Sequence, residues 1–339
     1  MCILKYIIIQ NILIPLISLI FSREIGGIFL LLKAVLNEFI YECKIRNLTP
    51  QTIKSYHNSN NLMIQWLINN RNITDIEQIK PADLKAYIFY KLDNNAKETY
   101  INGIIKTMRA FFKYAVENEY IANNPVLKVK WAKESKPLIK TFTNEQAVQL
   151  SNAFSNANYL ESRNKTIIIM LLETGIRNNE LCILKDISIS DSVLTILGKG
   201  NKERQVGISS ILQKQLITYN RIKKAYFEDK IIHHDALFLS RTGRKCTVVT
   251  IENIMIEAGE RIGIDDNIRC SPHTCRHFYA QTMVKNGIDI YSLSRLLGHG
   301  NISITQRYLE SMLDKDIVER SMKTSPLMNI EKRKDNYYE

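Results

Sequence analysis

The chain has 339 residues, of which 45% are apolar, so it can build the cores of two domains and is not predominantly disordered. Lys and Arg total 46 against 34 Asp and Glu, which gives a formal net charge of +12. A chain this basic favours a polyanionic partner, most often nucleic acid, although a basic surface without that role would have the same composition.

Residues 1–30 form an apolar extension whose role the sequence leaves open. Residues 6–21 read YIIIQNILIPLISLIF, which is interrupted by polar residues and a proline and is short for a membrane span of about 20 apolar residues. A signal peptide is disfavoured because Phe21-Ser22-Arg23 is a poor small-residue cleavage site. We favour an additional helix packed on the first domain, or translation begun upstream of the true start, over a membrane anchor.

Residues 31–125 are predicted to form a helical domain. Thr49 and Pro50 are a helix start signal, with threonine at the N-cap and proline at the first helical position. Pro81 opens another helix in the same way. These start signals, with apolar residues between them, predict several consecutive helices.

The strongest helical signal of this domain spans residues 95–118. Its apolar residues recur every three, four and seven positions, which places them on one helix face. Lys106 and Arg109 lie off that stripe. They are candidates for contacts with DNA phosphates, and a solvated helix face would explain them equally well.

A basic linker is expected at residues 126–142, after a stop signal that contains a proline. It includes Lys128, Lys130 and Lys133. Between two domains, such an arm is expected to cross the DNA backbone, because phosphate contacts supply much of the affinity of proteins for DNA. A solvated tether is the alternative.

Residues 143–325 are predicted to form a second domain that combines helices with a small β-sheet. A strongly apolar helix is expected at 166–174, with Gly175 as its C-terminal cap. Strands are expected at 193–197 and 203–208, joined by a turn that reads Gly-Lys-Gly-Asn.

Other features of the sequence argue against a metal site and against nucleotide hydrolysis. The six cysteines form no CxxC pair and no zinc-like spacing, which predicts reduced thiols in a cytoplasmic protein and no metal site. Cys275, although it lies among polar residues, is expected to pack as a small apolar side chain. No glycine-rich phosphate loop is present, so nucleotide hydrolysis has no support. The last residues, 326–339, form a polar tail.

Short motifs follow one another in the second domain: TGIRNNEL at 174–181, GKGNKER at 198–204, HTCRH at 273–277, LGHG at 297–300, and Tyr308. Each alone would arise by chance, but their order and spacing together resemble the tyrosine recombinase (phage integrase, Xer-type) family. The first domain resembles the helical core-binding domain of that family on weaker evidence. The resemblance implies a mostly α-helical protein with a small β-sheet, in which an N-terminal SAM-like core-binding domain precedes an α+β catalytic domain.

The resemblance implies that Arg177 and Arg276 clamp the DNA phosphate that is cut. Cleavage of a phosphodiester builds negative charge on its non-bridging oxygens, and planar guanidinium groups match that geometry. Arg276 lies in a helix that Ser271 is expected to cap, and Arg177 follows a sharp turn. Glu180 is expected to hold the Arg177 guanidinium in place rather than to bind a metal.

The same resemblance assigns the other site residues. Lys199, at the tip of the predicted hairpin, would protonate the leaving 5′ oxygen, with Lys202 as the competing candidate. His273 would transfer protons and bind the phosphate, and His299 would donate a hydrogen bond to it. His277 is left out of the set because it is expected to pack away from the site.

Tyr308 is expected to be the nucleophile. A phenol has a pKa of about 10, so it needs a base or nearby cations to attack at neutral pH. Ser303 and Gln306 are a candidate capping pair for the helix that carries it. Tyr291 precedes the LGHG motif and is expected to be an ordinary helix residue.

Together these residues predict a site-specific DNA recombinase, of the integrase, excisionase or Xer-like resolvase type, that works through a covalent 3′-phosphotyrosine. The reaction conserves the energy of the phosphodiester, so no ATP, cofactor, metal or small-molecule substrate is expected. The resemblance implies a C-shaped clamp on double-stranded DNA and a homotetramer on two specific sites, with accessory DNA-bending proteins as further partners.

Three alternatives stay open on the sequence alone. A type IB topoisomerase shares the chemistry but relaxes supercoils alone and without a specific sequence, and the small first domain argues against it. A protein that keeps the fold but has lost catalysis is opposed by the intact set from Arg177 to Tyr308. A membrane-tethered DNA-binding protein would rest on residues 6–21 alone.

Overall fold

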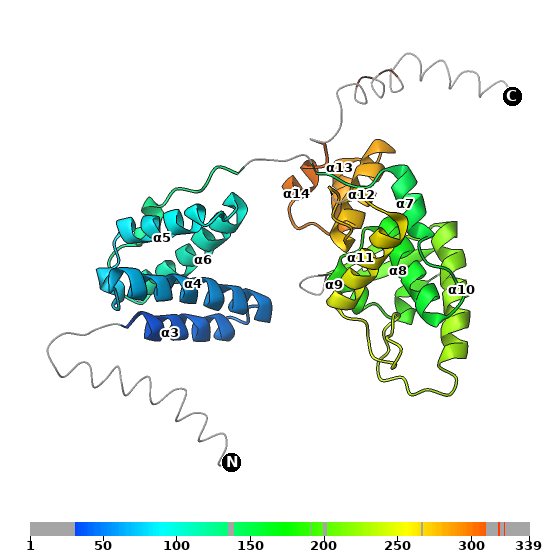
Figure 1. Ribbon diagram of the computed structural model, residues 1–339, viewed down its shortest axis with the longest axis horizontal. Coiled ribbons are helices and arrows are strands. Elements are labelled where there is room, and N and C mark those ends of the chain that lie inside the picture. The colour runs from blue at the N-terminus through cyan, green and yellow to red at the C-terminus, as the bar shows by residue number, and fades with distance from the viewer. Residues whose placement is uncertain are drawn as a thin grey trace, which may run out of the picture. The chain divides into compact units, whose positions relative to one another are not determined.

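The computed structural model of the protein describes residues 31–134, 139–190, 192–198, 202–265 and 267–309, together with Val318 and Met322. The chain divides into two compact units, Met1–Lys136 and Pro137–Glu339 (Figure 1). The apolar extension 1–30, the polar tail 326–339 and Lys199 lie outside the described residues, so the predictions for them stay predictions. In the part of the chain that the structure describes, no helix is long and apolar enough to cross a membrane.

The first unit is built from helices. Its elements are, in chain order, α3 Leu32–Ile45, α4 Pro50–Arg71, the 3₁₀ turn η2 Ile76–Gln78, α5 Pro81–Asp93, α6 Glu98–Glu117 and the 3₁₀ turn η3 Pro125–Lys128. The predicted helix starts at Pro50 and Pro81 are confirmed, and Oγ1 of Thr49 caps α4 by accepting from the N–H of Thr52 at 3.3 Å. The predicted apolar face of α6 is confirmed too, with Phe111 fully buried on it.

The first part of the basic linker is not a free arm. Val126 and Val129 are 0% and 3% exposed and belong to the core of the first unit, because η3 and its C-cap place residues three apart on one side of the turn. Beyond them, the side chain of Asn102 on α6 pairs with the backbone of Ala132. Its Oδ1 accepts from the Ala132 N–H at 2.8 Å, and its Nδ2 donates to the Ala132 carbonyl at 2.9 Å. The chain is therefore fixed to α6 as far as Ala132, rather than released at residue 126.

The second unit combines helices with one small sheet. Its elements are α7 Asn144–Ser151, α8 Tyr159–Thr174, α9 Asn178–Cys182, the 3₁₀ turn η4 Asp186–Ser188, β1 Ile189–Ser190, β2 Val193–Leu197, β3 Glu203–Gly207, α10 Ser210–Tyr226, α11 Val248–Ile262, α12 Pro272–Lys285, α13 Ile290–Leu297 and α14 Ser303–Gln306. The strands pair antiparallel in the order β1-β2-β3, with Thr195 opposite Gln205. The predicted hairpin is confirmed, and the short strand β1 is an addition that the sequence did not indicate.

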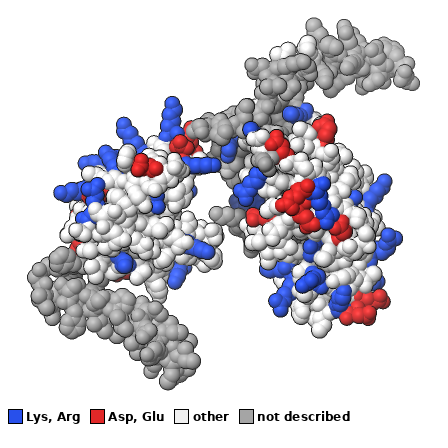
Figure 2. Space-filling model, in the orientation of Figure 1, with Lys and Arg blue, Asp and Glu red and all other residues white. Residues whose placement is uncertain are grey.

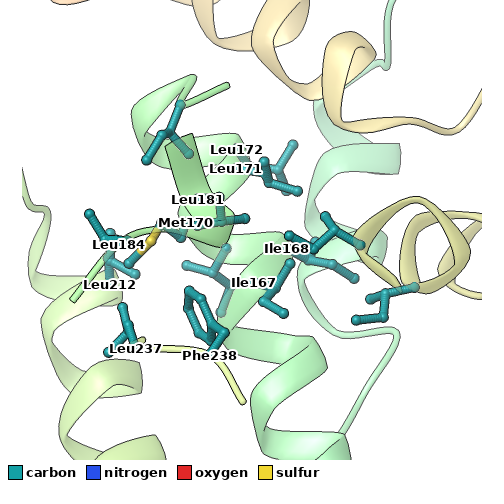
Figure 3. Close-up of a cluster of buried hydrophobic side chains, with 14 of the residues drawn as sticks. Ile167, Ile168, Met170, Leu171, Leu172, Leu181, Leu184, Leu212, Leu237 and Phe238 are labelled. Carbon is teal, nitrogen blue, oxygen red and sulfur yellow. The ribbon is translucent and has the colours of Figure 1, made fainter. Parts of the chain in front are cut away.

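Helix α8 is the centre of the second unit, and α7, α10, α11 and α12 all pack against it. Figure 3 shows Ile167, Ile168 and Leu171 of this helix gathered with Phe238 in a core from which solvent is excluded. A helix that is apolar on nearly every side is expected at the centre of a large core, and this position explains the run TIIIMLLET. Cys275 of α12 is 0% exposed in the same core, as predicted.

Helix α8 ends at Gly175, where φ is +57° and a Cβ would lie 2.5 Å from Cδ1 of Tyr279. We expect Gly175→Ala to destabilise the protein by about 2–4 kcal/mol, because alanine is strained in the left-handed conformation and the Tyr279 ring must move. Urea or thermal unfolding measures this. Gly263→Ala is the matched control, since φ there is +66° but the space around it is open. Equal losses in the two variants would show that the contact with Tyr279 has no effect.

Candidate active site

Four segments of the second unit bring the expected catalytic residues together. Helix α12 carries His273 and Arg276, and the turn between α8 and α9 carries Arg177. The loop after α13 carries His299, and Tyr308 follows α14. Hydrogen bonds join these segments, so motifs that are far apart in the sequence form one site.

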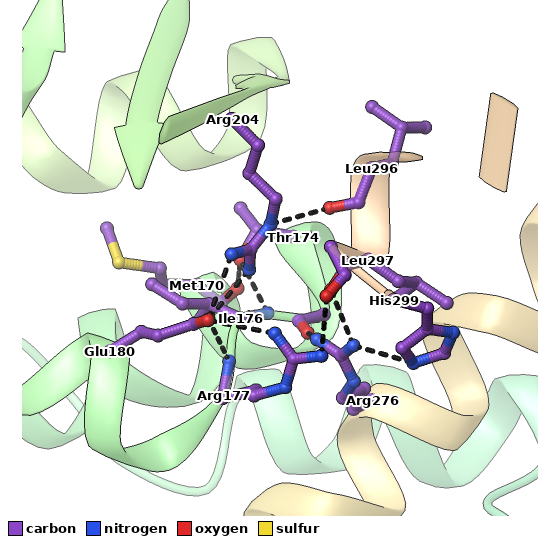
Figure 4. Close-up of polar contacts among 12 residues, drawn as sticks. Met170, Thr174, Ile176, Arg177, Glu180, Arg204, Arg276, Leu296, Leu297 and His299 are labelled. Carbon is purple, nitrogen blue, oxygen red and sulfur yellow. Dashed lines mark hydrogen bonds and ion pairs between the residues drawn. The ribbon is translucent and has the colours of Figure 1, made fainter. Parts of the chain in front are cut away.

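Arg276 is held inside the protein, where it is 4% exposed. Its guanidinium donates to the carbonyl oxygens of Gly175 and Leu297, each at 2.6 Å, and to Nε2 of His299 at 2.9 Å (Figure 4). Burial and the neighbouring arginines lower its pKa to about 10, so the group stays charged at neutral pH. A charged guanidinium fixed in this way is a preorganised binding group for an anion.

Arg177 is more accessible, with 38% of its side chain exposed. Its Nη2 donates to the carbonyl oxygen of Gly298 at 2.8 Å, and its Nη1 donates to Oε1 of Glu180 at 2.9 Å. Oε2 of Glu180 accepts from the backbone N–H of Arg177 at 3.0 Å. Burial raises the pKa of Glu180, but hydrogen bonds from Arg204 and Arg177 outweigh burial and hold that pKa below its usual value. Glu180 therefore holds Arg177 through both its side chain and its backbone.

A third arginine, which the sequence did not single out, joins this cluster. Arg204 on β3 donates to both carboxylate oxygens of Glu180, at 2.9 and 2.7 Å, and to the carbonyl oxygen of Leu296 at 2.8 Å (Figure 4). It occupies the last position of the GKGNKER motif. The motif marked this segment as part of the site, but the pairing of Arg204 with Glu180 could be seen only in the folded structure.

His299 orients Arg276 in the structure. A guanidinium can only donate, so Nε2 of His299 accepts from Arg276, and the ring proton lies on Nδ1, which donates to Oγ1 of Thr305 at 2.7 Å. Burial and the charge of Arg276 lower the pKa of His299 to about 4, which leaves the ring neutral at physiological pH. With this tautomer Nε2 has no proton for a phosphate, so the donor role expected from the sequence requires a change of ring protonation.

Tyr308 is enclosed and hydrogen-bonded. It is 4% exposed, and its Oη lies 3.0 Å from Nδ1 of His277. Burial raises the pKa of Tyr308, while the charge of Arg276 opposes that rise. Burial and the neighbouring His273 lower the pKa of His277 to about 4. The His277 ring is therefore neutral at physiological pH, and its Nδ1 can accept the hydrogen bond of the Tyr308 hydroxyl.

The expectation that His277 packs away from the site is wrong. It lies four residues after His273 in α12, and the centroids of the two rings are 4.1 Å apart, because positions i and i+4 share one helix face. That spacing is visible in HTCRH and was the signal that could have identified His277. His273 itself remains exposed.

A cleft of about 1480 Å³ opens beside this cluster, and Arg177, Arg204 and His299 line part of it. Lys202, from the hairpin turn, is exposed at the same cleft. Lys199, the preferred candidate for protonating the leaving oxygen, lies outside the described residues. The cationic side chains in the lining suit a polyanion. Among the residues that the structure describes, no group of three or more His, Cys, Asp or Glu could hold a metal ion.

The candidate DNA-binding residues of the first unit fall into two groups. Exposed lysines form the first: Lys106, Lys128, Lys130 and Lys133. Arg109 forms the second and is half-buried, with its Cζ 4.3 Å from the centroid of the Trp131 ring and its Nη2 donating to the carbonyl of Val129 at 3.3 Å. Arg109 thus helps to fix the linker to α6. Figure 2 shows Lys and Arg side chains spread over both units on the face drawn.

The helix before Tyr308 begins differently from the sequence-based expectation. The predicted capping pair of Ser303 and Gln306 is wrong, because Ser303 is already the first residue of α14. The N–H of Ser303 donates instead to Oδ1 of Asn301 at 2.9 Å. An asparagine in the preceding turn therefore supplies the side-chain acceptor, a role for which its short amide is well suited.

The buried histidines predict how stability depends on pH. The pKa values of His277 and His299 are about 4 in the folded protein, against a usual value of 6.5. The unfolded chain therefore binds more protons between these values, and stability is complete above pH 6.5 and falls as the pH is lowered to 4. The loss is expected to reach roughly 1–3 kcal/mol for each histidine.

Thermal unfolding of the DNA-free protein between pH 7.5 and 4.5 measures this dependence. The variant His277→Gln should show a shallower loss of stability over the same range, because glutamine does not titrate. A pH dependence identical to that of the wild type would contradict a neutral, buried His277.

Two family models match the chain. The phage integrase family model matches residues 140–314, which is just over half of the chain. The model of the phage integrase N-terminal SAM-like domain matches residues 36–119. The predicted order, a SAM-like domain followed by an integrase catalytic domain, is confirmed.

Curated relatives and solved structures agree with these matches. Tyrosine recombinase XerD of Halalkalibacterium halodurans is 28% identical over 276 residues, which cover 80% of this chain and 91% of that protein. Tyrosine recombinase XerC of Staphylococcus epidermidis is 29% identical over 277 residues, which cover 80% and 90%.

Two DNA complexes share the fold. The XerH site-specific recombinase bound to a palindromic difH substrate has a TM-score of 0.68 at 18% identity, over 86% of this chain and 85% of that one. The Tn1549 transposon integrase in complex with transposon right end DNA has a TM-score of 0.67 at 18% identity, over 86% of this chain and 99% of that one. At these identities the likeness shows the fold alone.

Proposed function

Because the chain belongs to the phage integrase family, we propose that it is a site-specific DNA recombinase that cuts and rejoins double-stranded DNA through Tyr308. One observation carries the proposal: two guanidinium groups share a site with a tyrosine whose hydroxyl faces a neutral imidazole. Anion-binding groups, a nucleophile and a proton acceptor are the parts that metal-free phosphoryl transfer requires.

In the proposed first step, Oη of Tyr308 attacks the phosphorus of the scissile phosphodiester. A 3′-phosphotyrosine forms as the bond to the 5′ oxygen breaks. The negative charge of the bound phosphate raises the pKa of His277 above its value in the DNA-free protein, and the phenol proton passes to its Nδ1, 3.0 Å away. Arg177 and Arg276 stabilise the charge on the non-bridging oxygens. The leaving oxygen takes a proton from the hairpin, where Lys199 is our candidate.

The second step reverses the first with another strand. The 5′-hydroxyl of a second duplex attacks the 3′-phosphotyrosine, so the DNA bond forms again and Tyr308 is released with its proton. One phosphoester is exchanged for another in each step. The chemistry therefore needs neither ATP nor a cofactor.

Specific double-stranded DNA sites are the proposed substrate. The similar XerH and Tn1549 proteins are described in complexes with DNA, and four exposed lysines on the first unit, defined above, are available for phosphates. We further propose a homotetramer on two paired sites, accessory DNA-bending proteins as additional partners, and the cytoplasm as the compartment.

Covalent trapping tests the proposal. The protein is incubated with nicked duplexes drawn from DNA that flanks its own gene, since integrases often lie beside their attachment site, and the products are separated on denaturing gels. A protein–DNA band on one duplex and not on others is the expected result. An active recombinase on its own site shows that the trapping conditions work.

Other outcomes identify the alternatives. Retardation on native gels without any covalent band would indicate a DNA-binding protein that has lost catalysis. Relaxation of any supercoiled plasmid, without sequence preference and by the protein alone, would indicate a type IB topoisomerase.

A further inference from the structure

Arg204 on β3 is enclosed, with 10% of its side chain exposed. Every nitrogen of its guanidinium donates within the site: Nε to the carbonyl of Leu296, and Nη1 and Nη2 to the two carboxylate oxygens of Glu180 (Figure 4). The side chain thus links the sheet to α9 and to the end of α13. Three of its five N–H groups are thus paired with these partners, so Arg204 can act on the reaction through them.

The shared partner is Glu180, whose carboxylate also binds Arg177. Oε1 accepts from Nη1 of both arginines, and Oε2 accepts from Arg204 and from the backbone N–H of Arg177. Two guanidinium groups and one carboxylate carry a net charge of +1, from +2 and −1, whereas Arg177 and Glu180 alone would be neutral. The second arginine therefore leaves the group of Arg177, Glu180 and Arg204 with a net positive charge for the phosphate, beside the charge of Arg276.

Two glycines, Gly198 and Gly298, let the backbone pass close to the Arg204 guanidinium. At Gly298, φ is +63° and a Cβ would lie 3.0–3.2 Å from the Arg204 side chain. At Gly198, a Cβ would lie 3.6 Å from Nη1 of Arg204. The carbonyl of Gly298 also accepts from Arg177 at 2.8 Å. Arg204 is consequently packed against the loop from which His299 projects.

We propose that Arg204 is a positioning residue for DNA cleavage. It offsets the charge of Glu180 and fixes that carboxylate, so that Arg177 keeps both its orientation and its positive charge for the phosphate. Through Leu296 it also fixes the end of α13, immediately before the loop that carries His299. The proposal rests on the proposed recombinase function, because cleavage is the step that Arg204 supports.

Full-length variants test it on a trapping duplex. Arg204→Met should form the covalent complex roughly tenfold to a hundredfold more slowly, with DNA affinity within about threefold of the wild type. Arg204→Lys keeps the positive charge but loses the planar guanidinium that binds both carboxylate oxygens of Glu180. It should recover part of the cleavage rate. Arg221→Met, at an exposed position on α10, removes the same charge and should match the wild type. An Arg204→Met rate equal to the wild type would overturn the proposal.

A double variant separates charge compensation from structural support. If Arg204 offsets Glu180, then Glu180→Gln should restore part of the cleavage rate lost in Arg204→Met. If Arg204 and Glu180 act only as structural supports, their losses add and the double variant is slower than Arg204→Met. That result would overturn the proposal.

A measurement without DNA keeps this inference distinct from the recombinase function. In an NMR titration of side-chain carboxyl groups, the pKa of Glu180 should rise in Arg204→Met and stay unchanged in Arg221→Met. An unchanged Glu180 pKa would overturn the role of Arg204 even if the wild type cleaves DNA. A wild type that never forms a covalent complex would refute the recombinase function, and the titration would still decide the charge compensation. If Arg204→Met does not fold, Arg204→Gln, which is also uncharged, takes both measurements.

Discussion

Replacing Tyr308 with phenylalanine is expected to abolish the covalent protein–DNA complex and to leave DNA affinity within about twofold of the wild type. The substitution removes only the oxygen that would attack phosphorus, and the reaction has no other route to a phosphotyrosine. Folding should survive, because Tyr308 packs with Tyr279 and Leu297 in an apolar cluster that phenylalanine also fills. The lost hydrogen bond to His277 costs about 1 kcal/mol.

Denaturing gels of trapping duplexes measure this result, and native gels of the same duplexes measure affinity. Tyr291→Phe is the matched control, since Tyr291 on α13 is 64% exposed and loses the same oxygen. It should form the covalent complex at the wild-type rate. A band that persists in Tyr308→Phe, or that disappears in Tyr291→Phe, would show that another residue attacks.

Local signals account for most of the fold that could be predicted. The starts of α4 at Pro50 and α12 at Pro272, and the end of α8 at Gly175, follow from the backbone preferences of those residues themselves. The β2–β3 hairpin follows from two short apolar runs around a glycine-containing turn. The order of the motifs carried the family resemblance, which the family models confirm.

Contacts between distant segments account for most of what could not be predicted. Arg204 and Glu180 meet across 24 residues because the fold brings the side chain of Arg204 on β3 to Glu180 on α9, and no local pattern records that. The contact of His277 with Tyr308 spans 31 residues, although the helical spacing in HTCRH already placed His277 on the face of His273. In the basic linker the lysines predicted an arm across the DNA backbone, which stays a prediction, and no local pattern indicated that Val126 and Val129 would pack into the core of the first unit.

Arg177→Ala is expected to slow cleavage by about 3–4 kcal/mol, the cost of a lost preorganised donor, while DNA binding largely survives. Its side chain is 38% exposed, so the fold should lose little stability. Single-turnover formation of the covalent complex, native gels and thermal unfolding measure the three quantities. Equal losses of binding and cleavage would count against an action of Arg177 at the transition state.

Arg276→Ala provides the contrast, because this arginine is 4% exposed and serves the fold as well as the phosphate. Its removal leaves the carbonyl oxygens of Gly175 and Leu297 without their donor, at about 1–3 kcal/mol for each buried group. It also frees His299, whose Nε2 loses the guanidinium that it accepts from. We therefore expect Arg276→Ala to lose cleavage and thermal stability together. If Arg276→Ala proves as stable as Arg177→Ala, the buried hydrogen bonds of Arg276 do not hold α8, α12 and α13 together around the site.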